Sequence, residues 1–296
     1  MADIIDLLRE IDGFRGISES DVKITPIWKK ENYLYFARIY REKLILKYSL
    51  KGWGEYELNA MKLLFKEGYP VPRPKGFVPE HEIQEADWAY GNVKRKVGLL
   101  VYSYVEGETL EKRLDIKKLA DAIKLLKRFH DDERHHREKP FIPNYQQTEV
   151  GRAKYYLSNL SKTGYLSQIE VQEILKIVKS YERMKIDFKV IHGDFRPGNL
   201  IDSDDIVMID FEGFSEGADN YKDLGIFIAE LQRIVDMRNL EIDPEEIINI
   251  YSTNLSPDEK LRLDFSRIRR GFVFMKWNTK YRKKAKQRLM EIVQKQ

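Results

Sequence analysis

Short runs of β-branched and aromatic residues dominate the first hundred residues of the chain. Three of them follow one another at residues 22–28, 33–40 and 43–48. Short polar segments separate these runs, and such spacing predicts an antiparallel meander with tight turns. Two more strand-like segments lie at residues 75–78 and 97–105, and we predict a loop or an irregular hairpin for the polar stretch 79–96 between them.

One stretch in this part of the chain, residues 53–67, carries its apolar residues at helical spacing instead. The apolar positions are Leu58, Met61, Leu64 and Phe65. Their recurrence every three or four residues predicts a helix with one apolar face. Gly68 and three prolines follow by residue 74. Because prolines cannot continue a helix, we expect the helix to end before them.

From residue 106 onward the apolar spacing is mostly helical. Helices are predicted at residues 116–133, 169–184, 221–236, 244–250, 257–270 and 278–294, with a strand-rich patch at 188–214. A strand-rich first third and a helix-rich remainder indicate an α+β fold with two lobes. We predict an N-terminal lobe at residues 1–104 and a C-terminal lobe at residues 105–296.

The composition excludes several kinds of chemistry. The 296 residues include no cysteine, so disulfides, thiolate zinc sites, iron–sulfur clusters and cysteine nucleophiles are excluded. No run approaches the roughly 18 uncharged apolar residues of a membrane span. The N-terminal ten residues carry acids where a signal peptide carries bases, and we therefore expect a cytoplasmic protein.

The net charge of +4, from 52 basic and 48 acidic residues, conceals an asymmetry along the chain. Residues 260–296 hold 13 bases against two acids, which gives +11 for this segment and −7 for the rest. Leu289, Ile292 and Val293 form an apolar stripe among these bases. The pattern therefore favours an amphipathic helix with a solvated basic face over a nucleic-acid-binding element.

The candidate catalytic and metal-binding residues are concentrated in the strand-rich patch at residues 188–214, just after its first predicted strand. The sequence reads VIHGDFRPGNLI over residues 190–201 and VMIDFE over residues 207–212. Asp194 lies in a loop bounded by glycine and proline, so its carboxylate can face a cleft. Asn199 and Asp210 flank a predicted hairpin, which brings an amide oxygen and a carboxylate together as hard ligands for Mg²⁺. With Asp194 near an incoming hydroxyl, these groups make a phosphoryl-transfer site.

This pattern resembles the kinase-like phosphotransferases of the aminoglycoside phosphotransferase and choline kinase superfamily. Its members show His-Gly-Asp, four residues and Asn where protein kinases usually show His-Arg-Asp, and choline-kinase-like members show Ile-Asp-Phe-Glu. The resemblance implies that Asp194 orients the acceptor hydroxyl and accepts its proton. It also implies that Asn199 and Asp210 ligate the metal. Glu212 would be a second-metal or supporting carboxylate, and a salt bridge within the loop is the alternative.

The N-terminal third resembles the same superfamily. Lys47 stands in the third strand, where the family's lysine contacts the α- and β-phosphates, and Glu57 in the next helix would be its partner, with Glu55 as the alternative. The hinge whose backbone groups meet the adenine would be formed by Ser103, Tyr104 and Val105. Residues 29–33 resemble the loop over the phosphates, without the glycines of the protein-kinase loop.

Residues around the motif are expected to support it. His192 would hold the loop by hydrogen bonding, Asp223 would cap the helix that starts near it, and His130 would be a packing residue with satisfied hydrogen bonds. Arg196 replaces a histidine that is frequent in the family motif, and it adds positive charge beside the acceptor site. It would contact the γ-phosphate or an anionic substrate, or pair with nearby acids.

The resemblance implies an ATP- and Mg²⁺-dependent kinase that transfers the γ-phosphoryl group to a hydroxyl of a small molecule. A sugar, an amino alcohol or an aminoglycoside-like compound are the expected acceptors. A non-catalytic kinase-fold scaffold, like the spore-coat proteins related to this superfamily, and a protein kinase are the alternatives. The short segment 215–221 leaves little room for an activation loop, which argues against a protein kinase.

The identity of the acceptor stays open at this point. The C-terminal helices carry the aromatic residues Phe272, Phe274, Trp277 and Tyr281 among many bases. An aromatic-lined pocket favours a sugar face or an alkylammonium group, whereas the bases favour an acidic acceptor. The preference for ATP or GTP, the number of metals and the oligomeric state stay open as well.

Overall fold

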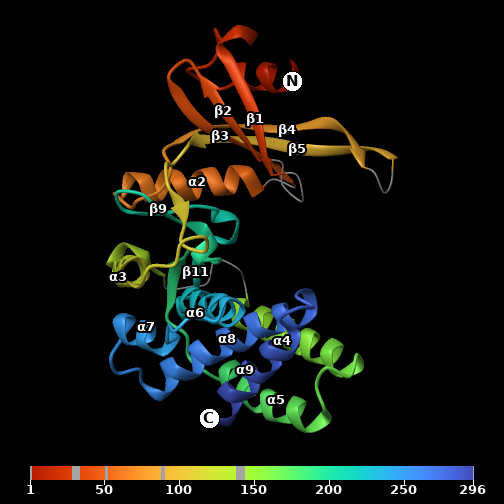
Figure 1. Cartoon of the computed structure of the whole chain (residues 1–296), viewed down its shortest axis with the longest axis vertical. Helices are drawn as coiled ribbons and strands as arrows, with labels where there is room; N and C mark the ends of the chain where they lie inside the picture. Colours follow the sequence, from red (N-terminus) through yellow and green to blue (C-terminus); the bar gives the residue numbers. More distant parts are fainter. Residues whose placement is uncertain (1, 29–33, 51–52, 88–90, 138–143, 296) are drawn as a thin grey trace. The chain divides into compact units, whose positions relative to one another are not determined.

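The structure is a computed structural model that describes residues 2–28, 34–50, 53–87, 91–137 and 144–295. The chain forms two compact units (Figure 1). The first unit contains Met1–Gly107 and Ser203–Glu212, and the second contains Glu108–Asp202 and Gly213–Gln296. The segment with Asp210 and Glu212 therefore belongs to the unit of the N-terminal sheet, although it comes much later in the chain.

A five-stranded antiparallel sheet forms the frame of the first unit, with strand order β1-β2-β3-β5-β4. Its strands are β1 (Val22–Trp28), β2 (Leu34–Ile39), β3 (Glu42–Leu50), β4 (Pro74–Asp87) and β5 (Gly91–Ser103). The unit also contains α1 (Ala2–Arg9), a 3-10 turn at Glu19–Asp21, α2 (Trp53–Lys66) and β10 (Ile206–Met208). The predicted meander of the first three strands is confirmed.

The hairpin of β4 and β5 extends further than the two strand-like segments in the sequence. Pairing continues to Asp87 opposite Gly91, after a register shift between Val78 and His81. Of the two alternatives for residues 79–96, the irregular hairpin is observed. This stretch lacks the apolar alternation of a half-buried strand, so its strands could not be read from the pattern.

The core of the first unit lies between α1 and one face of the sheet. Leu8 of α1 packs in one cluster with alternate sheet residues such as Leu44 and Leu99. Helix α2 lies on the other side of the sheet (Figure 1), and it buries Leu58, Met61 and Leu64 as its spacing predicts. Phe65 is the exception, because its side chain is exposed.

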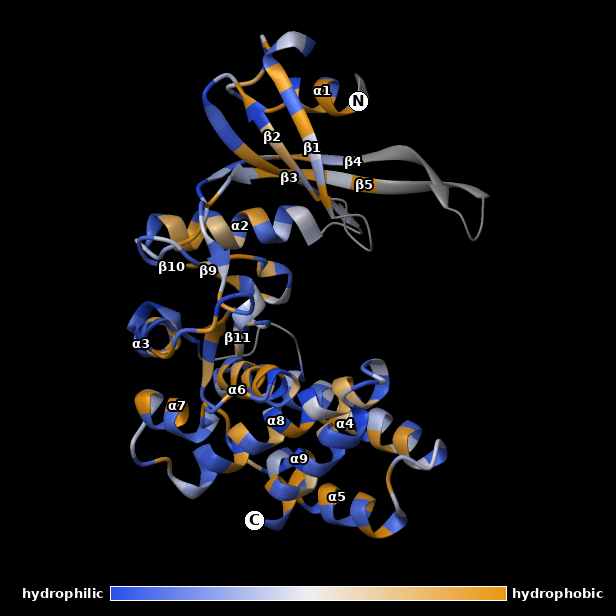
Figure 2. Cartoon of the chain, viewed as in Figure 1, coloured by the Kyte–Doolittle hydropathy of each residue, from blue (hydrophilic) through white to orange (hydrophobic). Residues whose placement is uncertain are grey.

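The second unit is mainly helical, and apolar and polar positions alternate along its helices (Figure 2). Its helices are α3 (Ile116–Asp131), α4 (Tyr145–Lys162), α5 (Gln168–Glu182), α6 (Tyr221–Arg238), α7 (Pro244–Tyr251), α8 (Pro257–Trp277) and α9 (Arg282–Gln294). Its strands are β6 (Glu108–Thr109), β7 (His136–Arg137), β8 (Phe188–Ile191), β9 (Leu200–Asp202) and β11 (Ser215–Asp219). Strand β8 pairs with β7 and β11, and β6 pairs with β9. Together the two units confirm the α+β class.

Helix α4 has no counterpart among the predicted helices. It buries Val150, Ala153 and Leu157, but polar and charged residues separate these positions and weaken the apolar stripe. Its N-cap residue, Asn144, makes no capping hydrogen bond with its side chain. Asn144 is a residue type that often precedes a helix, but without a clear apolar stripe after it this signal alone does not predict one.

The C-terminal helices use their aromatic residues in different ways. Helix α8 runs seven residues past its predicted end at Arg270. Phe272 packs in the main core of the unit, whereas the side chain of Trp277 is exposed. Of the four aromatic residues, Phe274 and Tyr281 alone share a cavity, of about 390 Å³, among the described residues. Leu289 and Val293 of α9 are buried against the same core, as the apolar stripe predicts.

Several bases of the basic segment pair with acids from earlier segments of the second unit. Arg262 pairs with Asp219 at 2.7 Å and Arg288 with Asp236 at 2.6 Å. A further pair joins Lys286 to Glu170. Some of the surplus bases of this segment are therefore matched by surplus acids from the rest of the chain. In the described residues, no helix is long and apolar enough to cross a membrane.

Candidate active site

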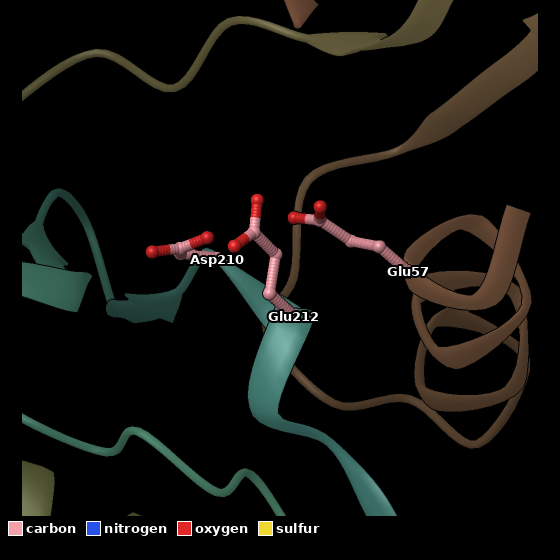
Figure 3. A group of neighbouring side chains, drawn as sticks. All are labelled: Glu57, Asp210 and Glu212. Atoms are coloured by element: carbon pink, nitrogen blue, oxygen red, sulfur yellow. The ribbon is translucent and has the colours of Figure 1, made fainter. Parts of the chain in front are cut away.

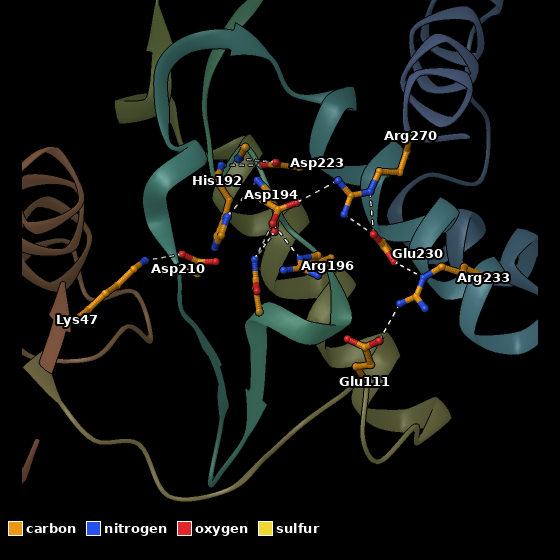
Figure 4. A network of polar contacts seen from close by, with 12 residues as sticks. Lys47, Glu111, His192, Asp194, Arg196, Asp210, Asp223, Glu230, Arg233 and Arg270 are labelled. Atoms are coloured by element: carbon orange, nitrogen blue, oxygen red, sulfur yellow. Dashed lines mark hydrogen bonds and ion pairs between the residues drawn. The ribbon is translucent and has the colours of Figure 1, made fainter. Parts of the chain in front are cut away.

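Lys47 and three carboxylates form a tight cluster in the first unit. Its Nζ lies 2.9 Å from Oε2 of Glu57, 2.8 Å from Oδ1 of Asp210 and 2.8 Å from Oε1 of Glu212. Figure 3 shows the three carboxylates turned toward one another, and Figure 4 shows the contact from Lys47 to Asp210. The predicted pair of Lys47 with Glu57 is therefore present, and Glu55 is not the partner.

Short backbone contacts bring the two acids after β10 to α2. The amide of Met208 donates to the carbonyl of Pro70 at 2.9 Å, which ties the strand to the turn after the helix. The amide of Phe211 then donates to Oε1 of Glu57 at 3.2 Å. Asp210 has a left-handed backbone with φ of 65°, which is uncommon outside glycine. Such strained residues are found at functional sites.

The surroundings raise the pKa of both Lys47 and Glu57, for different reasons. Burial alone would lower the pKa of Lys47, but the carboxylates of Glu57 and Asp210 outweigh it and raise this pKa well above the ordinary value. Glu57 is fully buried and faces two more acids besides the lysine. Burial, opposed by Lys47 and reinforced by Asp210, raises the pKa of Glu57 to about 7.

This raised pKa predicts a pH dependence of stability. A carboxyl whose pKa is higher in the folded protein adds stability below its unfolded pKa, and that stability is lost as pH rises through about 7. From pH 5 to pH 8 we expect the free energy of unfolding of the wild type, relative to Glu57→Gln, to fall by up to about 3 kcal/mol. Urea unfolding at several pH values measures this difference. The control Glu55→Gln, exposed on the same helix, is expected to follow the wild type. Parallel wild-type and Glu57→Gln profiles would contradict the expectation.

The donor set of the cluster fits a hard cation. One carboxylate oxygen each from Glu57, Asp210 and Glu212 lies within 4.8 Å of the others. Glu57 is held by Lys47 and by the Phe211 amide, whereas the side chains of Asp210 and Glu212 are 34 % and 38 % exposed. Asp210 and Glu212 are therefore the members that could ligate Mg²⁺, while Glu57 positions the lysine.

The loop with Asp194 lies in the second unit, and it holds this carboxylate between two arginines. Oδ2 of Asp194 accepts from Nε of Arg196 at 2.9 Å and from Nδ2 of Asn199 at 3.0 Å. Oδ1 lies 3.6 Å from a guanidinium nitrogen of Arg270 (Figure 4). Because the Nδ2 group of Asn199 faces Asp194, its amide oxygen points elsewhere and could ligate a metal. Of the roles open to Arg196, pairing with a nearby acid is the one observed.

Asp223 anchors this loop from the start of α6. Its buried carboxylate accepts from the amides of His192 and Gly193, both at 2.7 Å. Gly193 has φ of 83°, and a Cβ there would overlap the carbonyl of Gly213, so the loop requires glycine. The predicted N-cap role of Asp223 is wrong, because the cap residue is Asn220 and Asp223 lies inside the first turn. Its carboxylate is used to hold the loop instead.

The two histidines act as the sequence predicts. His130 is buried and bonds Asp223 at 3.3 Å and the hydroxyl of Tyr251 at 2.9 Å. Nδ1 of His192 accepts from the amide of Asp194 at 3.4 Å. Both rings therefore support the loop through hydrogen bonds.

Sequence reasoning missed the role of Arg270. Its guanidinium bonds Glu230, which also accepts from Arg233, and Arg233 reaches Glu111 at 2.7 Å (Figure 4). This chain of charges fixes Arg270 beside Asp194. The basic character of residues 260–296 was the available signal, but it does not tell which base faces the loop.

The hinge residues lie at the end of β5 in the first unit. The amide of Ser103 donates to the carbonyl of Arg73 and that of Tyr104 to the carbonyl of Lys43, both at 2.9 Å. In the described backbone the amide of Val105 makes no such bond. Of the three predicted hinge residues, Val105 therefore has the amide that could meet a base.

The structure thus groups the predicted site residues into two sets. Lys47, Glu57, Asp210 and Glu212 come together in the first unit, and Asp194 and Asn199 come together in the second. The predicted phosphate loop at residues 29–33 lies outside the described residues.

Comparison with known proteins identifies the family. The model of the phosphotransferase enzyme family matches residues 23–242. This match spans most of the chain, and the chain therefore belongs to the phosphotransferase enzyme family. No curated protein matches the sequence significantly.

Solved structures share the fold at low sequence identity. Choline kinase from Cryptosporidium parvum Iowa II is 16 % identical, with a TM-score of 0.59 over 99 % of this chain and 94 % of that one. Spectinomycin phosphotransferase APH(9)-Ia, solved with ADP and spectinomycin, is 15 % identical, with a TM-score of 0.59 over 99 % and 96 %. Aminoglycoside phosphotransferase APH(3'')-Id from Streptomyces rimosus is 19 % identical, with a TM-score of 0.57 over 90 % and 97 %. The predicted kinase-like fold is confirmed.

Proposed function

We propose that the protein is a small-molecule kinase that uses ATP and Mg²⁺ to phosphorylate a hydroxyl group. The observation that carries this proposal is the Lys47 cluster, in which one buried ammonium meets Glu57, Asp210 and Glu212. A buried lysine held by a buried glutamate, next to two accessible carboxylates, is what phosphate and metal binding require. The family membership supports the same reaction.

Each predicted site residue has a role in the proposed reaction. Lys47 exchanges its contacts with Asp210 and Glu212 for the α- and β-phosphates, while Glu57 keeps it in place. Asn199, Asp210 and Glu212 would hold Mg²⁺, which neutralises phosphate charge when bound. Backbone groups of Ser103, Tyr104 and Val105 would meet the base, with the Val105 amide as the donor.

Asp194 is assigned the acceptor side of the reaction. Its carboxylate accepts a hydrogen bond from the acceptor hydroxyl and takes the proton as the reaction proceeds. The hydroxyl oxygen forms a bond to the γ-phosphorus, and the bond from that phosphorus to the β–γ bridging oxygen breaks. ADP leaves with the electron pair of that bond. Because ATP is a cytoplasmic metabolite, we retain the cytoplasm as the proposed location.

Nucleotide binding gives the most direct test of the proposal. ATP with Mg²⁺ is expected to raise the melting temperature, because a ligand at 100 times its Kd adds about 2.7 kcal/mol of stability. We expect a rise of roughly 4–5 °C for a chain of this size, measured by thermal shift with and without EDTA. The rise is expected to vanish in Lys47→Met and to persist in Lys43→Met, an exposed lysine of the same strand. No stabilisation of the wild type at millimolar nucleotide would favour the non-catalytic scaffold.

A further inference from the structure

A cavity of about 150 Å³ lies beside the Asp194 carboxylate, within the second unit. The loop of Asp194 and helices α4, α5, α6 and α8 form its wall. Its charged lining residues are Glu149, Asp194, Lys222, Arg269 and Arg270. Bases therefore outnumber acids in the wall of the cavity that adjoins the proposed catalytic carboxylate.

Both acids of this wall already face guanidinium groups. Glu149 is buried and accepts from Arg152 at 2.8 Å and from Arg269 at 3.1 Å. Asp194 is bonded by Arg196 and approached by Arg270. Among the described residues of the wall, each carboxylate is therefore already paired with a base. An incoming ammonium group would have to compete with that base.

One base of the wall, in contrast, has an unsatisfied donor. Nη1 of Arg269 is buried and has no hydrogen-bond partner among the described residues. A buried donor without a partner costs free energy. This nitrogen exposes less than 1 Å² of surface, so the guanidinium must turn toward the cavity before an anionic oxygen can satisfy it. Lys222 lines the same cavity, and its charge helps to lower the pKa of Glu149 against the opposing effect of burial. Glu149 therefore does not neutralise all the positive charge of the wall.

We propose that the phosphoryl acceptor is a small hydroxyl compound that carries a carboxylate or a phosphate group. Its anionic group binds Arg269 and Lys222, and its hydroxyl faces Asp194. The inference rests on the proposed phosphotransferase function and names the substrate class of that site. The cavity is smaller than the roughly 300–1,000 Å³ of pockets for drug-sized ligands, which also favours a small acceptor. Choline and spectinomycin appear in the names of two of the similar structures. Both compounds carry positively charged nitrogen groups, which the bases of this wall would repel.

Direct binding to the full chain, without nucleotide, tests the charge preference. The probes for calorimetry are glycerate and glycerol 3-phosphate as anions, glycerol as the neutral match and choline as the cation. We expect the two anions to bind better than glycerol or choline, and Arg269→Gln to weaken their binding about 10- to 100-fold. Glycerate and glycerol 3-phosphate distinguish a carboxylate from a phosphate as the group recognised.

Two further variants keep this test decisive. Arg152→Gln is the matched control, because Arg152 bonds the same Glu149 but is 55 % exposed and lies outside the cavity wall. Its effect on anion binding is expected to stay within about twofold. Lys222→Gln provides a second reading should Arg269→Gln fail to fold, and it is expected to weaken the same two probes.

Phosphoryl transfer, followed as ADP release with the same probes, separates the two proposals. Transfer to a bound anion, with a KM for the acceptor that rises in Arg269→Gln while the KM for ATP is unchanged, supports the inference. Equal or better binding and phosphorylation of glycerol, choline or an aminoglycoside overturns it and leaves the phosphotransferase function intact. Anion binding by a chain that ATP and Mg²⁺ do not stabilise overturns the proposed function and leaves only the anion site.

Discussion

Replacing Asp194 by Asn is expected to lower kcat by about 10²- to 10⁴-fold, the usual contribution of a positioned general base. An amide cannot take the proton of the acceptor hydroxyl, although it keeps the size of the carboxylate. The structure places this carboxylate between Arg196, Asn199 and Arg270. The side chain is 28 % exposed, so we expect the substitution to leave the fold intact. Initial-rate measurements of ADP release at saturating acceptor give the change in kcat.

Nucleotide binding and a matched variant show whether the loss is one of catalysis. The KM for ATP and the thermal shift with ATP and Mg²⁺ are expected to stay close to the wild type, since Lys47 and its acids are unchanged. Asp187→Asn, an exposed aspartate shortly before the loop, is expected to keep full turnover. Full turnover by Asp194→Asn, with ATP binding intact, would remove this residue from the proposed catalytic role.

The pair of Lys47 with Glu57 could be predicted because the motif residues stand in a fixed order along the chain. A lysine in the third strand, a glutamate in the next helix and the Ile-Asp-Phe-Glu segment each follow from local sequence. The contacts of Lys47 with Asp210 and Glu212 depend instead on the tertiary bonds that join Met208 to Pro70 and Phe211 to Glu57. What the sequence could not tell is that Glu212 also reaches the lysine, at 2.8 Å.

The acceptor side was less accessible to sequence reasoning. Arg269 and Arg270 lie inside the predicted helix 257–270, but they line the cavity beside Asp194 because α8 packs on α4 and α6. Helix α4, which supplies Glu149, was missed because its apolar stripe is narrow. Tertiary packing, which no local pattern encodes, selects the bases of the C-terminal segment that reach the cavity.

Asp223→Ala is expected to be the most destabilising single change in the loop region. It leaves the buried amides of His192 and Gly193 and the ring of His130 without their acceptor. Each unsatisfied buried group costs about 1–3 kcal/mol, so we expect the free energy of unfolding to fall by about 3 kcal/mol or more. Urea unfolding at pH 7 measures this loss. At that pH the carboxylate is charged, because hydrogen bonds and charge from His130 and His192 outweigh burial and lower the pKa of Asp223.

A second aspartate in the first turn of a helix provides the control for Asp223→Ala. Asp258 holds this position in α8 but is exposed, so Asp258→Ala removes only a helix-dipole contribution of at most about 1 kcal/mol. If the two variants lose similar stability, the backbone bonds of Asp223 do not hold the loop. If Asp223→Ala alone is strongly destabilised, the hydrogen bonds of this carboxylate hold the loop against α6. The position of Asp194 then depends on a residue that touches neither substrate. The folded Asp223→Ala protein is therefore expected to show a reduced kcat with little change in the KM for ATP.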